Sequence, residues 1–475
     1  MIYEADWVLP ITSAPIHRGA VKVDGGVIVD VGAAGEVRAR HPEDPVTGFH
    51  HAILMPGFVN AHVHLDYSVF RGLFDDCSFG DWMLHFMAAK RGLASPDYAA
   101  SAMLGAMECV SSGITAIGDT VFDGEATVRA ANAAGLRTYA FVEAFGMDDA
   151  RIRDSLEVTA KRIAHLHDIA GPLVSIGLSP HAPYTVSGPL YRALAAYAVR
   201  EGLKVATHVA ESQAEVTFVR NGAGVLAHDF RELVGWDDLM WMPTGTSPVK
   251  YLEQWDVFAA DVIAIHCVQV SPSDIEVLRK YDVAVAHCPK SNAKLACGIA
   301  PVGDFLAAGL RVGIGTDSLA SNNILDMFDE MRMTIFLHRA SQAPAACMTA
   351  DQVLAMATLG GARAGAGRYD RKPGGREAGG HGRCRHGVQS LRPHRRSGIG
   401  ACLRGEPGGC LLQHDRRTGG VRQEGLHRAG RRGGDEGSRV GPAETEGLMG
   451  PASTAGPSSG GQVGSAAPMG HNLKG

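Results

Sequence analysis

Hydrophobic and polar positions alternate in two different ways along the chain, and the first pattern covers residues 1–54. This part contains short β-branched runs, two of which, within residues 20–31, are joined through Asp24-Gly25-Gly26. Such runs around an Asp-Gly or Gly-Gly pair are typical of a β-hairpin. A unit of this size buries little apolar surface, so we expect it to pack against another part of the chain.

From residue 55 onward, short apolar runs alternate with amphipathic stretches, which predicts helices over 97–112, 155–170 and 188–201. The apolar runs predict eight strands, at 58–63, 113–119, 136–143, 173–179, 204–208, 262–266, 283–287 and 312–317. Eight near-continuous apolar strands alternating with helices predict an α/β fold, a closed (β/α)8 TIM-like barrel. A doubly wound open sheet is the alternative, but no Gly-x-Gly-x-x-Gly motif follows the first strand.

Polar side chains suited to metal binding lie at the C-terminal ends of several predicted strands. They are His62, His64, His208, His266 and Asp317. His62 and His64 point the same way because side chains alternate along a strand, so this pair could form half of a metal site. An isolated His-x-His is more often a pair of ordinary histidines. All five residues fall at the end of the barrel that carries catalytic residues, which favours a functional site.

Composition limits the class of protein. The chain has 475 residues, 45% of them hydrophobic and 20% charged, which is typical of a soluble globular protein. A formal net charge of −5 gives no indication of nucleic-acid binding. Nine scattered cysteines without a Cys-x-x-Cys motif predict reduced thiols and a cytoplasmic location. We expect no signal peptide and no membrane span, and a homodimer is left open.

The last part of the chain departs from this pattern. Residues 365–475 are rich in Gly, Arg, His and Ser, with one Tyr, one Ile and no Phe or Trp. Such a segment buries too little apolar surface to offset its ordering entropy, so we predict a disordered tail after a small domain, 1–54, and a barrel, 55–364. It could be a basic interaction arm. A shifted reading frame is the favoured interpretation, because reading 377–390 one base over can give a strand-like sequence.

Four segments together resemble the amidohydrolase superfamily. They are Pro56–His64, His208-Val-Ala-Glu211-Ser212, His266-Cys267 and Gly315-Thr316-Asp317-Ser318. The resemblance covers roughly residues 1–364 and is to the branch of mononuclear nucleobase and adenosine-type deaminases, which also holds triazine hydrolases. In such relatives the C-terminal part completes the N-terminal β-sandwich, so the altered tail puts that unit in doubt.

The resemblance implies that His62, His64, His208 and Asp317 bind one divalent metal, Zn²⁺ or alternatively Fe²⁺. A second metal in this superfamily usually needs a lysine at the fourth strand, and the segment 177–184 contains none.

The same resemblance implies catalytic roles for three side chains. Glu211 would move a proton between water and a ring nitrogen, Asp317 would accept a proton from the water, and His266 would stabilise developing charge. The alternative for Glu211 is a carboxylate at a helix N-terminus, and for His266 a polar core histidine. His287 and Cys288 are interpreted as structural.

Three further residues are predicted to contact the substrate. His181 matches a loop that contacts the nucleoside in adenosine-type deaminases. Counting from Trp82 puts Arg91 where these relatives carry a glutamate for the ribose hydroxyls. An arginine there would suit a carboxylate or phosphate, whereas the neighbouring Lys90 is interpreted as a solvated helix end.

The combination resembles aminodeoxyfutalosine deaminases of an alternative menaquinone pathway, so we expect hydrolytic deamination of 6-aminodeoxyfutalosine. Deamination of S-adenosylhomocysteine or methylthioadenosine is the nearest alternative, followed by hydrolysis of triazines. Two alternatives of another kind remain, an inactive barrel used for assembly and an enzyme damaged by its altered tail.

Overall fold

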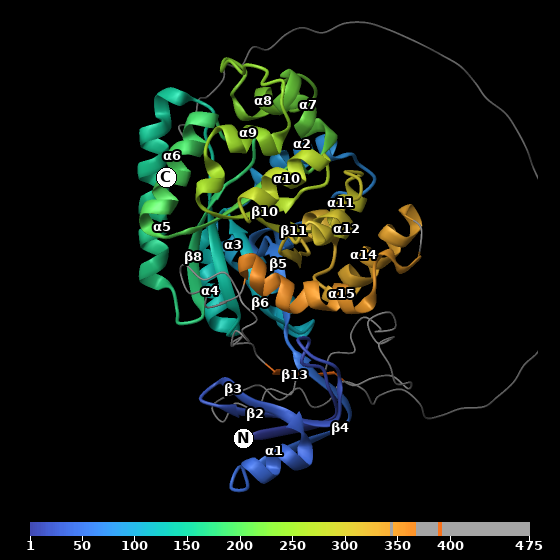
Figure 1. Ribbon diagram of the computed structural model, residues 1–475. Coiled ribbons are helices and arrows are strands. Elements are labelled where there is room, and N and C mark those ends of the chain that lie inside the picture. Colours follow the sequence, from blue (N-terminus) through green and yellow to red (C-terminus); the bar gives the residue numbers. More distant parts are fainter. Residues whose placement is uncertain (343–344, 367–387, 392–475) are drawn as a thin grey trace, which may run out of the picture. The chain divides into compact units, whose positions relative to one another are not determined.

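The computed structural model describes residues 1–342, 345–366 and 388–391. Four N-terminal strands and β13 form a small sheet of order β13-β4-β1-β2-β3. Its strands are β1 Ile2–Val8, β2 Ile16–Asp24, β3 Val27–Ala33, β4 Val46–Pro56 and β13 Val388–Leu391, and α1 spans Ala34–Arg40 (Figure 1). The predicted hairpin is the antiparallel pair β2–β3, which turns through Gly25 and Gly26 with φ of 53° and 79°. A positive φ at both positions favours glycine.

Eight strands form the second sheet, with each strand parallel to the next along the chain. They are β5 Phe58–Val63, β6 Ile114–Val121, β7 Arg137–Ala144, β8 Val174–Pro180, β9 Lys204–Val209, β10 Asp261–His266, β11 Ala284–His287 and β12 Val312–Ile314. The predicted barrel is confirmed. The last strand is shorter than expected and ends at Ile314, because the chain turns away and Asp317 adopts φ 58°.

The barrel closes between its first and last strands through side-chain hydrogen bonds. The Asn60 amide donates to the Thr316 hydroxyl at 2.7 Å, and the Thr316 N–H donates to Asn60 Oδ1 at 3.0 Å. The Asp317 N–H donates to the His62 carbonyl, also at 3.0 Å. This closure brings residues from opposite ends of the barrel sequence to one place, and it sets Asp317 beside His62.

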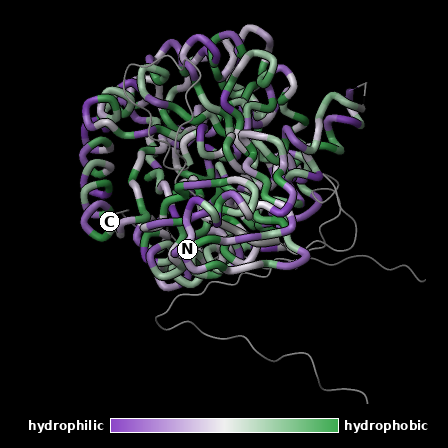
Figure 2. The backbone as a smooth tube through the Cα atoms, turned by 60° about the horizontal axis from the view of Figure 1, so that its bottom comes forward, coloured by the Kyte–Doolittle hydropathy of each residue, from purple (hydrophilic) through white to green (hydrophobic). Residues whose placement is uncertain are grey.

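Helices lie outside the strands, and Figure 2 shows hydrophilic and hydrophobic residues alternating along them. The α-helices are α2 Phe79–Lys90, α3 Ser95–Ser111, α4 Gly124–Ala134, α5 Ile152–Ile169, α6 Gly188–Glu201, α7 Gln213–Asn221, α8 Asp229–Val234, α9 Pro248–Gln254, α10 Pro272–Lys280, α11 Pro289–Lys294, α12 Val302–Ala307, α13 Leu319–Asn322, α14 Met327–Ser341 and α15 Ala350–Ala355. Short 3-10 turns are η1 Leu65–Phe70, η2 Asp149–Arg151, η3 Val257–Ala259 and η4 Ala345–Cys347.

Helix α6 has the bounds that its sequence predicts. The Ser187 hydroxyl accepts a hydrogen bond from the Leu190 N–H at the first turn, and the helix ends at Gly202 with φ 65°. A serine N-cap and a left-handed glycine after the last turn are common helix signals. The helix and strand signals therefore agree along this part of the chain.

The segment after α15 fills part of the barrel interior. It forms two π-helical turns, η5 Met356–Gly360 and η6 Ala362–Ala366. The three alanines of η6 pack in one apolar cluster with strand residues that include Val59, Phe141 and Ile263. Small side chains fit here because the helix backbone lies close to the strands.

Replacing Gly360 with alanine tests this close approach. A methyl group there would lie 2.3 Å from the Val312 carbonyl oxygen. Because backbone atoms would have to move, we expect Gly360→Ala to lower the free energy of unfolding by about 1–3 kcal/mol, measured by denaturant unfolding. Gly48→Ala is the control, since a methyl group there would meet no atom within 4 Å. Equal effects of the two substitutions would contradict this packing.

Most of the predicted tail lies outside the described residues. Of 365–475, the structure describes Gly365, Ala366 and the four residues of β13. Strand β13 pairs antiparallel with β4, so at least these four residues extend the small sheet. Within the described ranges, no helix is both long and apolar enough to cross a membrane. The six cysteines described there are all free thiols.

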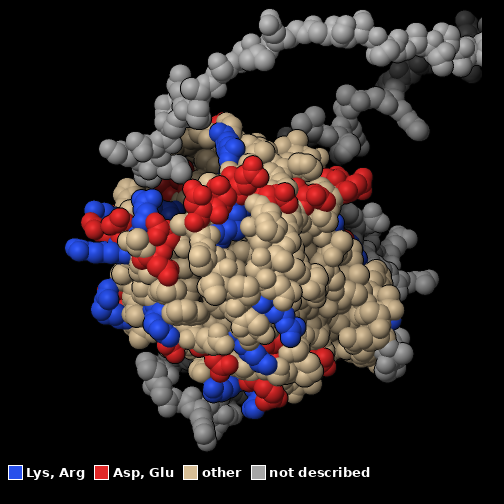
Figure 3. Space-filling model, turned by 90° about the horizontal axis from the view of Figure 1, so that it is seen from above, with Lys and Arg blue, Asp and Glu red and all other residues tan. Residues whose placement is uncertain are grey.

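Charged side chains are distributed unevenly over the face shown in Figure 3. Asp and Glu form a band across part of this face, whereas Lys and Arg lie scattered. Among the described residues on this face there is thus no continuous basic surface.

Candidate active site

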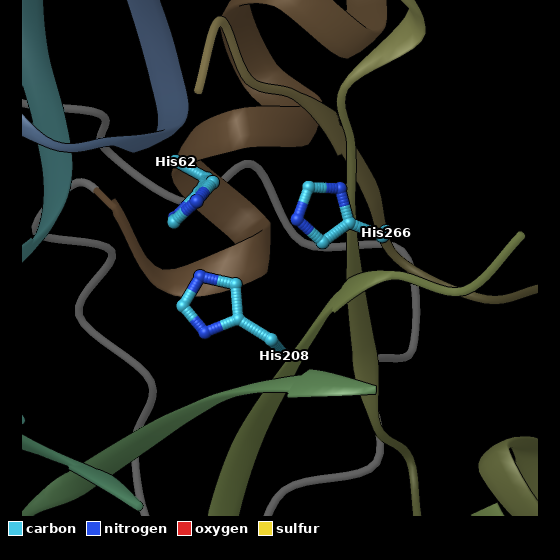
Figure 4. Close-up of side chains that lie close together, drawn as sticks. All are labelled: His62, His208 and His266. Atoms are coloured by element: carbon cyan, nitrogen blue, oxygen red, sulfur yellow. The ribbon is translucent and has the colours of Figure 1, made fainter. Parts of the chain in front are cut away.

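Three histidines from different strands point toward one another at the C-terminal end of the barrel (Figure 4). His62 is the last but one residue of β5, His208 belongs to β9 and His266 ends β10. A ring nitrogen from each lies within 4.8 Å of the others, and the same is true of the set His62, His64 and Asp317. All five side chains are buried. The structure therefore brings together every residue that the sequence placed at this rim.

His208 and His64 are held with their Nε2 atoms facing each other. The Nδ1 atom of His208 lies 3.0 Å from the His181 carbonyl, to which it can donate, leaving Nε2 free. That atom is 3.3 Å from His64 Nε2. His64 is held by the Thr120 hydroxyl at 3.1 Å and by the ring of Tyr67, stacked at 5.2 Å between centroids. Two imidazole nitrogens this close need a proton or a metal between them.

Asp317 is fixed by three hydrogen bonds that its carboxylate accepts. The donors are the Ser318 N–H at 2.7 Å, the Ser321 hydroxyl at 2.8 Å and the Ser291 hydroxyl at 2.5 Å. Its Oδ1 lies 3.4 Å from His62 Nε2. Burial opposes the charged form, but His62 and the other neighbouring histidines hold the pKa of Asp317 well below its ordinary value. The carboxylate is thus charged and aimed at the histidines.

The donor set fits a divalent metal. His62 Nε2 is buried and has no hydrogen-bond partner among the described residues, and such an atom is costly unless a ligand satisfies it. Burial lowers the pKa of His208 to about 3 and lowers those of His64 and His266 well below the ordinary value. Neutral imidazoles and one carboxylate are ligands that Zn²⁺ or Fe²⁺ accepts.

Glu211 lies beside these groups and faces His266. Its Oε1 is 3.6 Å from His266 Nε2, and the two residues together with Asp317 form a further set within 4.8 Å. The Asn292 amide contacts the other ring nitrogen of His266 at 3.0 Å and so fixes the ring. Burial, with the charges of Asp317 and Glu215, raises the pKa of Glu211 well above its ordinary value. Such a carboxyl group can hold a proton near neutral pH.

Glu215 holds the turn that carries Glu211. Its carboxylate accepts hydrogen bonds from the Ala210 and Glu211 N–H groups, both at 2.8 Å. Ala210 has φ 53°, a left-handed conformation that is unfavourable for alanine. His266, Cys267 and Asp317 also have positive φ, so three of the strand ends at the site are strained.

His181, which is half-buried, and the buried Trp82 also lie near this site. The ring of His181 is 4.9 Å from that of His208, and its Nδ1 is 2.7 Å from the Thr185 hydroxyl. Trp82 is buried, stacks on Phe86 and donates from Nε1 to the Ala320 carbonyl at 3.3 Å. Substrate contact by these residues stays a prediction.

Arg91 and Lys90 are placed differently from the expectation. Arg91 follows the end of α2, is exposed and donates to the Leu233 carbonyl, so the structure does not bring it to the cluster of metal ligands. The interpretation of Lys90 as a solvated helix end is wrong. Its ammonium donates to the Tyr67 hydroxyl at 2.6 Å and lies 3.4 Å from the centre of the Phe122 ring. Helix α2 turns Lys90 inward and leaves the next residue outside.

Sequence reasoning missed Glu143, the last but one residue of β7, which lies within 4.8 Å of ring nitrogens of His181 and His208. Burial raises its pKa to about 7, against the effect of Lys90. It ends the predicted strand 136–143, so the pattern that identified the histidines also applied to it. That pattern is not specific, because Asp119 ends another predicted strand and its carboxylate instead accepts hydrogen bonds from Leu65 and Thr127.

The fold and the site together identify the chain as a barrel hydrolase. Its active site is of the metal-binding type and lies at the C-terminal ends of the strands. Residues 53–367 match the model of the amidohydrolase family, and the chain belongs to this family. The predicted membership and the predicted hydrolase class are thereby confirmed.

The most similar relatives include two kinds of deaminase. The chain is 34% identical to the 5'-deoxyadenosine deaminase of Methanothermobacter thermautotrophicus over 354 residues, 74% of this chain and 77% of the relative. It is 33% identical to the 5-methylthioadenosine/S-adenosylhomocysteine deaminase of Pelotomaculum thermopropionicum, covering 73% and 75% of the two chains. Among solved structures, an adenosine deaminase from Xanthomonas campestris with bound zinc matches with a TM-score of 0.64 and 29% identity, over 76% and 79%.

Proposed function

We propose that this chain is a metal-dependent deaminase that replaces the amino group of an adenine nucleoside by oxygen from water. The observation that carries the proposal is the convergence of His62, His64, His208 and Asp317 around the unpartnered Nε2 of His62, with Glu211 alongside. The deaminase names of the relatives and of the similar zinc-containing structure support it. Each acts, by its name, on an adenosine or a derivative of it.

The four side chains His62, His64, His208 and Asp317 would hold one divalent metal, with Zn²⁺ preferred over Fe²⁺ as a proposal. When bound, such a metal supplies Lewis-acid activation of water near neutral pH. With three imidazoles and one carboxylate as ligands, the metal would take that water as a fifth ligand.

The proton transfers fall to this chain's own carboxylates. Glu211 takes a proton from the attacking water and delivers it to the ring nitrogen beside the carbon under attack, as its raised pKa allows. Asp317 accepts a proton from the water, and its bonds to Ser291 and Ser321 hold it in place. His266, held by Asn292, stabilises charge that develops on oxygen. Asp317 then passes its proton to the amino group, which departs as ammonia.

The proposal also concerns the group that the nucleoside substrate carries on its sugar. The expected substrate, 6-aminodeoxyfutalosine, rested on a cation at Arg91, and that side chain is exposed and donates to Leu233. Of the compounds named for the relatives, 5'-deoxyadenosine and 5-methylthioadenosine carry no carboxylate, whereas S-adenosylhomocysteine does. We retain all four compounds as candidate substrates, with an aminotriazine as the representative of substrates that lack a sugar.

Steady-state kinetics with these compounds tests the proposal. We expect metal-loaded protein to release ammonia from at least one adenine nucleoside with kcat/KM of about 10⁴ M⁻¹s⁻¹ or more, the usual range for enzymes. The triazine should be the poorest substrate. Hydrolysis of the triazine alone, with every nucleoside inert, would reject a nucleoside deaminase. A folded protein that binds metal but turns over none of them would favour the non-catalytic barrel.

A further inference from the structure

A buried polar cluster lies beside the metal ligands, formed by Glu143, Lys90 and Asp66. Glu143 is the last but one residue of β7, Lys90 ends α2 and Asp66 belongs to η1. Glu143 is 1% exposed and Asp66 is not exposed. Because a Glu143 oxygen lies within 4.8 Å of a His208 nitrogen, the cluster continues directly from the candidate metal site. The mechanism above uses none of these three residues.

Each carboxylate in the cluster has an oxygen without a partner. Among the described residues, Glu143 Oε2 and Asp66 Oδ1 are buried and accept no hydrogen bond. The other oxygen of Glu143 is 3.9 Å from His181 Nε2, which is too long for a hydrogen bond. Buried carboxylate oxygens are costly when unpartnered, so this cluster is suited to a ligand that donates hydrogen bonds.

Lys90 supplies the complementary donor. An ammonium group has three N–H donors, and in Lys90 one of them reaches the Tyr67 hydroxyl while the Phe122 ring covers another side. Within the described ranges, no carboxylate lies within 4.0 Å of this nitrogen. Glu143 and Asp66 nevertheless favour its charged form, although burial lowers its pKa to about 8. The Lys90 ammonium thus keeps donor capacity that neither carboxylate uses.

We propose that Glu143 and Lys90 form the subsite that binds the sugar hydroxyl groups of the nucleoside. This inference rests on the proposed deaminase function. A hydroxyl group donates one hydrogen bond and accepts others, so it can donate to Glu143 and accept from Lys90 at the same time. A carboxylate on the ligand could only accept, so it would leave the buried oxygens of Glu143 and Asp66 without a donor. The subsite therefore selects a neutral diol over an anionic group.

The position of the subsite agrees with this assignment. His181 is next to both Glu143 and His208, with its Nε2 3.9 Å from the Glu143 carboxylate and its ring 4.9 Å from that of His208. An aminopurine placed with its amino group at the metal ligands would extend past His181, which would carry the sugar toward Glu143. Arg91, the residue that counting along the sequence placed here, does not take part.

The test compares adenosine with its 2',3'-dideoxy analogue in wild type, Glu143→Gln and Lys90→Met. In wild type we expect kcat/KM to be about 10²-fold lower for the analogue, since two charge-assisted hydrogen bonds are lost. Both variants should lose about 10²-fold on adenosine and little on the analogue, so that discrimination disappears. Glu157→Gln is the matched control, because Glu157 lies on the exposed side of α5 and pairs with Lys161.

Binding measurements separate this inference from the proposed function. Titration calorimetry with the two nucleosides gives affinities whether or not turnover occurs, and we expect the same discrimination there, lost in Glu143→Gln. If wild type deaminates nothing but binds adenosine more tightly than the analogue, the proposed reaction fails and the subsite stands. Equal affinity of wild type for both nucleosides, or a loss in Glu143→Gln that is the same for both, would overturn the subsite.

Discussion

Glu211→Gln is expected to lower kcat/KM for the best nucleoside substrate by about 10³-fold, within the range for a lost general acid–base. The amide has nearly the shape of the carboxyl group, but it cannot carry a proton from water to the ring nitrogen. Because Glu211 is outside the proposed ligand set, the metal content should stay at that of wild type. Steady-state kinetics and metal analysis on the same preparations measure both quantities.

The matched control for Glu211 is Glu276→Gln. Glu276 is exposed on α10 and pairs with Arg279 at 2.8 Å. It is not one of the candidate active-site residues. We expect its variant to keep the activity of wild type. If Glu211→Gln retained more than about a tenth of wild-type activity, the proton-transfer role would be wrong.

Asp317→Asn should remove the metal as well as the activity. The amide cannot bring a negative charge to the three histidines, and its nitrogen would replace an oxygen that accepts from Ser318 or from the two serine hydroxyls. We expect wild type to hold about one metal per chain and the variant well under half of that after gel filtration, with kcat/KM lowered by about 10³-fold or more. Elemental analysis of the purified proteins measures the occupancy.

The control for Asp317 is Asp282→Asn, a substitution of an exposed aspartate whose carboxylate pairs with Arg311 at 3.2 Å. It should leave the metal content unchanged. A variant of Asp317 that kept a full metal complement would show that this carboxylate is not a ligand. A wild-type protein that holds no metal after growth with zinc would favour the damaged-enzyme alternative.

The strand pattern predicted the barrel because its strands are buried on both faces and therefore read as apolar runs. The same pattern identified the candidate site residues, because each lies at the end of such a run or directly after it. They are His62, His64, His208, His266 and Asp317. Local signals also sufficed for α6, whose capping serine and terminal glycine are adjacent in sequence to the helix. These features depend on short stretches of chain.

Contacts between distant segments could not be read in the same way. The Asn60–Thr316 pair closes the barrel across 256 positions of sequence, and nothing local marks either residue. Successive residues of a helix point about 100° apart, so the end of α2 directs Lys90 and Arg91 to different sides. Counting along the sequence therefore chose the wrong one of two neighbouring cations as the inward-facing side chain.

The central claim is that the chain uses water to replace the amino group of an adenine nucleoside. The most direct measurement incubates metal-loaded full-length protein with 5'-deoxyadenosine in isotopically labelled water and analyses the product by mass spectrometry. We predict the deaminated hypoxanthine nucleoside with one labelled oxygen, released together with ammonia, and no such product with Glu211→Gln on the same timescale. Recovery of unchanged nucleoside from a folded, metal-containing wild-type protein, with methylthioadenosine and aminodeoxyfutalosine equally unchanged, would contradict the claim.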